Sequence, residues 1–163
     1  MYYRFGKAFH FLTVLFFVFV FLYIYSALSD IIAYEVDEQG AWLNSFSKEQ
    51  FFYIGIITFL VLNVLLVTPA KLIENQTFAS FKRLFPKEDK FRDYLLAWIY
   101  SFVGIVNISL AILAFFVHSI NNQNEISSGS FNVFFYMVPV FFVIWLVTLF
   151  WILIQKFKSL KTV

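Results

Sequence analysis

Cysteine is absent from this 163-residue chain. Its absence excludes disulfide bonds, thiolate nucleophiles, and zinc or iron–sulfur centres with cysteine ligands. Charged residues are also scarce, at 13% of the chain, and none lies inside the four long apolar runs that make up most of the sequence. Ion-coupled carriers use ionisable side chains near the middle of the membrane. The lack of such residues therefore argues against a proton- or sodium-driven carrier built from this chain alone.

The four apolar runs are each 19 to 24 residues long, and the chain is 61% hydrophobic. At about 1.5 Å of rise per residue, each run spans a hydrocarbon core of about 30 Å, where only a helix satisfies its own backbone groups. We therefore predict an all-α membrane protein, a single domain over residues 1–163 with no soluble domain. Its four transmembrane helices are expected in an antiparallel bundle at about residues 8–30, 48–69, 90–118 and 131–156.

Lysine and arginine fall almost entirely on one side of this predicted membrane protein. Of the twelve, only Lys48 lies in the first connection and none lies in the third. The other eleven lie in the N-terminal flank, the second connection or the C-terminal tail. Cytoplasmic segments are enriched in these residues. We therefore expect cytoplasmic termini, external loops at residues 31–47 and 119–130, and a bacterial inner (cytoplasmic) membrane as the location.

Local signals predict where the second helix begins and ends. Ser47 can cap its N-terminus, and Gln50 three residues later can complete a capping box. Pro69 is expected to end the same helix. In the loop before the helix, residues 37–40 read as a turn, and the third connection reads as a flexible polar segment.

A short amphipathic helix is predicted at about residues 71–85, before Pro86. Aromatic and aliphatic side chains gather on one face of a helical wheel and basic ones on the other, as in helices that lie at the membrane interface. A docking surface for a cytoplasmic partner is the alternative interpretation. The candidate residues for contact with lipid are Lys71, Lys82, Arg83, Phe78 and Phe81.

The third long helix carries a stripe of small and polar residues at three- and four-residue spacing. Small side chains let helix backbones approach closely in lipid, so we expect this helix at the centre of the bundle. Asn63 and Asn107 are predicted at the same depth on neighbouring helices, close enough to share a hydrogen bond. The candidate packing and polar-clamp residues are Asn63, Asn107, Ser101, Gly104 and Ala111.

No catalytic or metal-binding pattern is visible. The chain has no Gly-x-Ser-x-Gly elbow, no glycine-rich phosphate loop and no His-Glu-x-x-His pair. His10 and His118 are predicted in opposite leaflets, so they cannot hold one metal ion or haem between them, although each could be a single axial ligand in a larger complex. We expect neither an enzyme nor a cofactor.

The composition favours a non-catalytic accessory or structural subunit that packs against other membrane proteins. The alternative is a small transporter or channel that acts as an oligomer, with a pore lined by Asn63, Thr58, Asn107 and Ser101. The expected partners are the lipid bilayer and other integral membrane proteins or further copies of the chain, and not nucleic acid.

Overall fold

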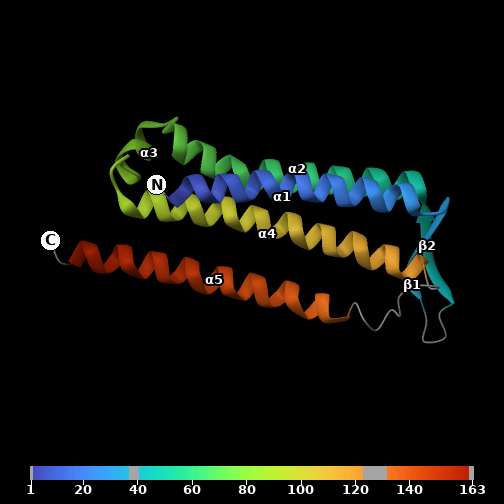
Figure 1. Cartoon of the computed structure of the whole chain (residues 1–163). Helices are drawn as coiled ribbons and strands as arrows, with labels where there is room; N and C mark the ends of the chain where they lie inside the picture. The colour runs from blue at the N-terminus through green and yellow to red at the C-terminus, as the bar shows by residue number, and fades with distance from the viewer. Residues whose placement is uncertain (1, 37–40, 123–131, 162–163) are drawn as a thin grey trace.

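The computed structural model describes residues 2–36, 41–122 and 132–161 (Figure 1). In chain order its elements are α1 (Tyr2–Ala27), β1 (Ile31–Val36), β2 (Trp42–Ser47), α2 (Lys48–Asn75), α3 (Ala79–Leu84), α4 (Lys90–Asn121) and α5 (Asn132–Lys161). Four of these, α1, α2, α4 and α5, are long and apolar enough to cross a membrane, which confirms the prediction of four such helices. The predicted turn at 37–40 and most of the third connection lie outside the described residues.

Helix α4 contacts α1, α2, α5 and β1, whereas α5 contacts α4 alone among the described elements. Figure 1 shows α1 lying along α4, with α2 partly behind α1 in this view and α5 below α4. Both chain ends and α3 lie at one end of the helices, and β1 and β2 lie at the other. The helix with the small-residue stripe is therefore the one that the other long helices share.

The first connection forms a two-stranded antiparallel hairpin, which the sequence analysis did not predict. Its register pairs Ile31 with Ser47 and Ile32 with Phe46. The side-chain amide of Asn121, at the end of α4, donates to the carbonyl of Ala33 (2.7 Å) and accepts from its N–H (2.9 Å). Isolated hairpins are marginally stable. This hairpin is stabilised by Asn121, which is far away in the sequence, so no local sequence pattern predicts it.

Helix α2 begins where predicted but does not end at Pro69. The Ser47 hydroxyl accepts from the N–H of Gln50 (3.2 Å), and the Gln50 side chain accepts from the N–H of Ser47 (2.9 Å). The helix continues to Asn75 because its last turns are packed, with Ala70 and Ile73 both buried. This burial outweighs the single backbone hydrogen bond that a proline removes.

The predicted amphipathic helix at 71–85 is wrong as one continuous element. Lys71 belongs to the last turns of α2, and Gln76 adopts a left-handed conformation (φ 50°) that ends that helix. Only Ala79–Leu84 forms α3, which carries the exposed Lys82 and Arg83. Phe81 is half-buried against the cluster around Ala70 and Ile73, and Phe78 is exposed at the start of α3.

Candidate functional site

Asn63 of α2 and Asn107 of α4 form the amide pair that their matching depth predicted. The Asn63 Nδ2 donates to Asn107 Oδ1 (2.8 Å) and also to the carbonyl of Phe59 (2.9 Å). In return, Asn107 Nδ2 donates to Asn63 Oδ1 (3.3 Å). The Asn107 side chain is completely buried. Buried amides are stable in lipid only when their hydrogen bonds are made, and here both amides have partners.

Helix α1 adds two side chains to this pair, and we call His10, Thr13, Asn63 and Asn107 the polar clamp. His10 Nε2 lies 2.9 Å from Asn63 Oδ1. Because the Asn63 amide nitrogen already donates to two acceptors, its oxygen faces His10, and the imidazole nitrogen must carry the proton. Thr13 Oγ1 accepts from Asn107 Nδ2 (3.4 Å) and donates to the carbonyl of His10 (2.8 Å).

Sequence reasoning missed the part that His10 and Thr13 play in the clamp. The first apolar run predicts a helix that begins at about residue 8, with His10 in its first turn, whereas α1 begins at Tyr2. Eight residues at about 1.5 Å each carry His10 about 12 Å along the helix. The aromatic residues before the run, which are favourable at an interface, were the signal for this earlier start.

Glycines allow α1 and α4 to approach closely. A Cβ at Gly104 would lie 2.5 Å from the Phe9 ring, and one at Gly6 would lie 2.8 Å from the carbonyl oxygen of Ala97. Both distances are shorter than atoms tolerate. At Gly6 the contact is with the backbone of α4, so a larger side chain would force the helices apart, whereas at Gly104 the Phe9 ring would have to move. Ala111, another predicted packing residue, is buried in the core that α1, α2 and α4 share.

Glu74 connects three helices at the end of the molecule where the chain begins. Its carboxylate pairs with Lys7 of α1, lies 3.7 Å from Lys71 and accepts from the Tyr100 hydroxyl of α4 (2.9 Å). Its backbone carbonyl accepts from the buried Arg92 (3.1 Å). Glu74 lies within the predicted 71–85 helix, but the structure places it in the last turn of α2.

Among the described residues, the contacts between α4 and α5 include two tryptophans and an ion pair. Trp98 Nε1 donates to the carbonyl of Trp145 (2.8 Å), and Trp145 Nε1 donates to the Ser101 hydroxyl (3.1 Å). At the chain ends, Lys156 pairs with Asp89, the N-cap of α4, whose carboxylate also accepts from the N–H of Phe91 (2.9 Å). Ser101, predicted as a packing residue, therefore faces α5 and not the polar clamp.

The surroundings of Asp89 lower the pKa of its carboxyl group. Partial burial alone would raise the pKa of its carboxyl. The hydrogen bond from Lys156, the backbone hydrogen bond from Phe91 and the positive charge of Lys156 oppose this effect, and together they hold the pKa of Asp89 below its usual range. It is the ionised carboxylate of Asp89 that pairs with Lys156 of α5.

A cavity of about 470 Å³ lies between α1 and α5, and we call it the α1–α5 groove. Phe5 and Phe9 form its α1 side, and Thr148 lies on its α5 side. Ala97 and Ser101 of α4 lie between them. Among the described residues, no Cα atom of α1 lies within 8 Å of a Cα atom of α5.

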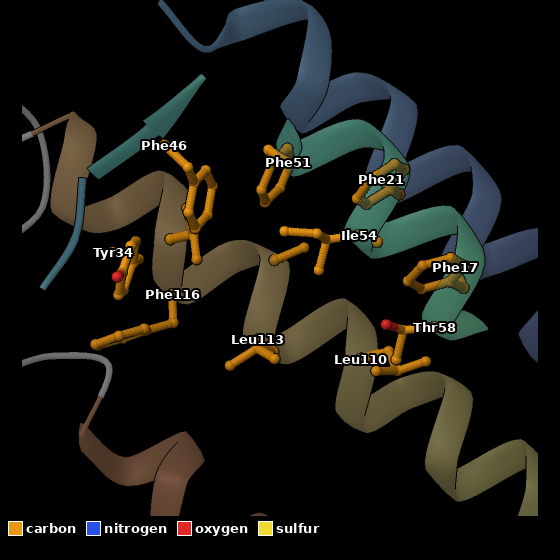
Figure 2. A pocket seen from close by; sticks show the side chains of 13 residues that line it. Phe17, Phe21, Tyr34, Phe46, Phe51, Ile54, Thr58, Leu110, Leu113 and Phe116 are labelled. Atoms are coloured by element: carbon orange, nitrogen blue, oxygen red, sulfur yellow. The ribbon is translucent and has the colours of Figure 1, made fainter. Parts of the chain in front are cut away.

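A second cavity, of about 320 Å³, lies at the hairpin end of the helices, and we call it the hairpin groove (Figure 2). Phe17 and Phe21 of α1 lie at its back, and α2 and α4 form its two walls. Tyr34 and Phe46 of the hairpin close one end. Its lining contains no charged residue.

Within the described part of the chain, no group of three or more histidine, aspartate or glutamate side chains could hold a metal ion. His118 lies in the last turn of α4, far along the chain from the polar clamp. No family model, curated protein or solved structure matches the chain. The four long apolar helices thus place the protein in the class of helical proteins with the length and composition to span a membrane.

Proposed function

We propose that this protein is a non-catalytic subunit that spans the membrane four times and binds a transmembrane helix of another membrane protein. The observation that carries the proposal is the α1–α5 groove, a cavity flanked by two helices whose described Cα atoms are all more than 8 Å apart. Ala97 and Ser101 at its floor are small, and small residues allow the close backbone approach on which helix association in lipid depends.

The groove matches a helix better than it matches a polar substrate. Its walls are mainly aromatic and aliphatic, and the indole N–H groups of Trp98 and Trp145 are already used to attach α5. The Thr148 hydroxyl donates to the carbonyl of Trp145 within its own helix (2.8 Å). A transmembrane helix makes all its backbone hydrogen bonds internally, so it needs no polar partner from the groove. Its apolar side chains can pack against the aromatic and aliphatic walls.

The proposed orientation puts both termini in the cytoplasm of a bacterial cell, with the four helices as an antiparallel bundle in the inner membrane. Support comes from the shared end of the chain termini and α3 (Figure 1), because eleven of the twelve lysines and arginines belong to these segments or adjoin them. In this orientation, α3 lies at the cytoplasmic interface, where Phe78 meets the acyl boundary and Lys82 and Arg83 meet headgroups.

The positions of the polar residues within the helices favour the subunit interpretation over the channel interpretation. Asn63 and Asn107 bond to each other, and Asn107 is inaccessible to solvent. Ser101 accepts from Trp145, and Thr58 lines the hairpin groove. The four residues of the predicted pore lining therefore have three different surroundings, which favours a subunit over an oligomeric channel lined by all four.

Copurification with a groove-filling variant tests the proposal. Thr148→Trp places a large ring in the α1–α5 groove, and Thr68→Trp is the matched control, since Thr68 is also exposed and also bonds within its own helix (2.6 Å to Val64). After mild solubilisation of native membranes, we expect a stoichiometric membrane protein with the wild type and with Thr68→Trp, but not with Thr148→Trp. A homo-oligomer that conducts ions in liposomes would overturn the proposal.

A further inference from the structure

The side chains that line the hairpin groove are held in place by their neighbours, so they do not rotate to fill it. Phe17 stacks on Phe59 (ring centroids 4.3 Å apart) and on Phe21 (5.4 Å). Phe21 stacks in turn on Phe51 (5.2 Å) and lies directly over Gly55, where an added Cβ would be 2.4 Å from the ring. Because these rings are fixed by each other, the back of the groove is rigid, and rotation of a single side chain does not fill it.

The hairpin end of the groove is equally fixed. The ring of Tyr34 stacks on Phe46 (4.9 Å), and Phe46 stacks on Phe51 (6.0 Å). The Asn121 side chain, bonded to Ala33, holds the hairpin against α4. A preformed apolar cavity loses dispersion contacts along its whole lining when it is empty, so its occupation is favourable.

The groove opens sideways, between α2 and α4. Ile54 and Leu113, one on each wall, are half exposed (57% and 50%) although both lie within helices apolar enough to span a membrane. The walls come together beyond the other end, where Asn63 and Asn107 bond α2 to α4. The opening therefore faces the surrounding lipid, and the groove is closed along the helix axis by the polar clamp at one end and the hairpin at the other.

The length of the groove matches a segment of a hydrocarbon chain. On α4 the lining extends from Leu110 to Val117, which is about 10 Å at 1.5 Å per residue. The long axis of the groove runs parallel to the helices, and an acyl chain in a bilayer has the same orientation. Figure 2 shows the one phenol, Tyr34, at the hairpin end, where the chain would join its polar headgroup, and Phe17 and Leu110 at the opposite end.

We propose that the hairpin groove binds one acyl chain of a phospholipid from the leaflet on the hairpin side, with the chain terminus pointing toward the polar clamp. Rigid aromatic surfaces at the back and a lateral opening are the features that favour an acyl chain at this position. The proposal does not depend on a partner protein in the α1–α5 groove, because the two grooves lie on different sides of α4 and share no lining residue.

Photolabelling of the full-length protein in nanodiscs tests this proposal. The probes are two phosphatidylethanolamines with a diazirine on one acyl chain, either near the ester or at the chain terminus. After irradiation, adducts are mapped by mass spectrometry. We expect the ester-proximal probe to label Tyr34 and Phe116, and the terminal probe to label Phe17, Thr58 and Leu110. The reverse order, or labelling that follows side-chain exposure alone over all four helices, would overturn the proposal.

A pair of variants separates a specific site from general contact with lipid. Leu113→Trp fills the opening of the groove, and Leu146→Trp is the matched control, since Leu146 of α5 is also 50% exposed but does not line either groove. We expect Leu113→Trp to abolish the groove adducts and Leu146→Trp to leave them unchanged. Ile54→Trp repeats the test from the opposite wall. Equal labelling in all variants contradicts the proposal, whereas failure of copurification at the α1–α5 groove leaves it unaffected.

Discussion

The side-chain amide of Asn63 donates to Asn107 across 2.8 Å, and the reciprocal bond from Asn107 is 3.3 Å long. These residues are 44 positions apart in the chain, and they join α2 to α4 in a part of the molecule that is otherwise apolar. His10 and Thr13 of α1 bond to the same two amides. The polar clamp thus fixes the relative position of three helices with four side chains.

A double-mutant cycle measures the strength of this contact. We expect Asn63→Ala and Asn107→Ala each to destabilise the protein, because each leaves the other amide partly without partners. Their coupling free energy should be about 0.6 kcal/mol and at most about 1.7 kcal/mol, the range for hydrogen bonds between membrane helices. Unfolding in mixed micelles of increasing denaturing detergent gives the four stabilities required. A coupling of zero would mean that the two amides do not act as a pair.

Close packing at Gly104 is also expected to contribute to the stability of the protein. Gly104→Leu should destabilise the protein by about 1–3 kcal/mol, the usual cost of overpacking, because even a Cβ there would collide with Phe9. Ala8→Leu on α1 is the control, since Ala8 is exposed. Thermal unfolding in detergent compares the two. Equal stability of both variants would show that Gly104 is not at a close helix contact.

The pairing of Asp89 with Lys156 predicts a pH dependence for the attachment of α5. Since the pKa of Asp89 is lower in the folded protein than in the unfolded chain, its ionisation stabilises the folded state above the unfolded value. That value is about 3.9 for aspartate, so the contribution is complete near neutral pH and is lost as the pH falls through the lower, folded pKa.

Asp89→Asn isolates this contribution. The variant should be less stable than the wild type near pH 7, and the difference should shrink as the pH falls below about 4, where the wild-type carboxyl also becomes neutral. The neighbouring Glu88→Gln is the control, because Glu88 is exposed and has no ion pair within the described residues. A difference that is constant from pH 7 to 3 would show that the charge of Asp89 does not hold α5.

The sequence predicts the features that depend on local composition. Four apolar runs predict four long helices, Ser47 and Gln50 predict the start of α2, and equal depth predicts the pairing of Asn63 with Asn107. Two of the misses, the end of α2 and the hairpin, involve contacts made over long distances along the chain. Pro69 does not end α2 because Ala70 and Ile73 are buried in a cluster with Leu96 and Tyr100 of α4. The hairpin forms because Asn121 bonds to Ala33.

The proposed orientation is tested by reporter fusions. Fusions after Val163 and between Lys82 and Lys87 should report a cytoplasmic location, and a fusion near Gln39 should report an external one. The physical reason is the retention of lysine- and arginine-rich segments on the cytoplasmic side. An external C-terminus would contradict both the orientation and the number of membrane crossings.

The most direct test of the proposed function is photocrosslinking in living cells from position 148, in the α1–α5 groove. A photoreactive amino acid replaces Thr148, and the same amino acid at Thr68 on α2 is the control. The account predicts a saturable crosslink from position 148 to a transmembrane helix of one other membrane protein, and none from position 68. Crosslinks from position 148 that reach only lipid, or that match those from position 68, would contradict it.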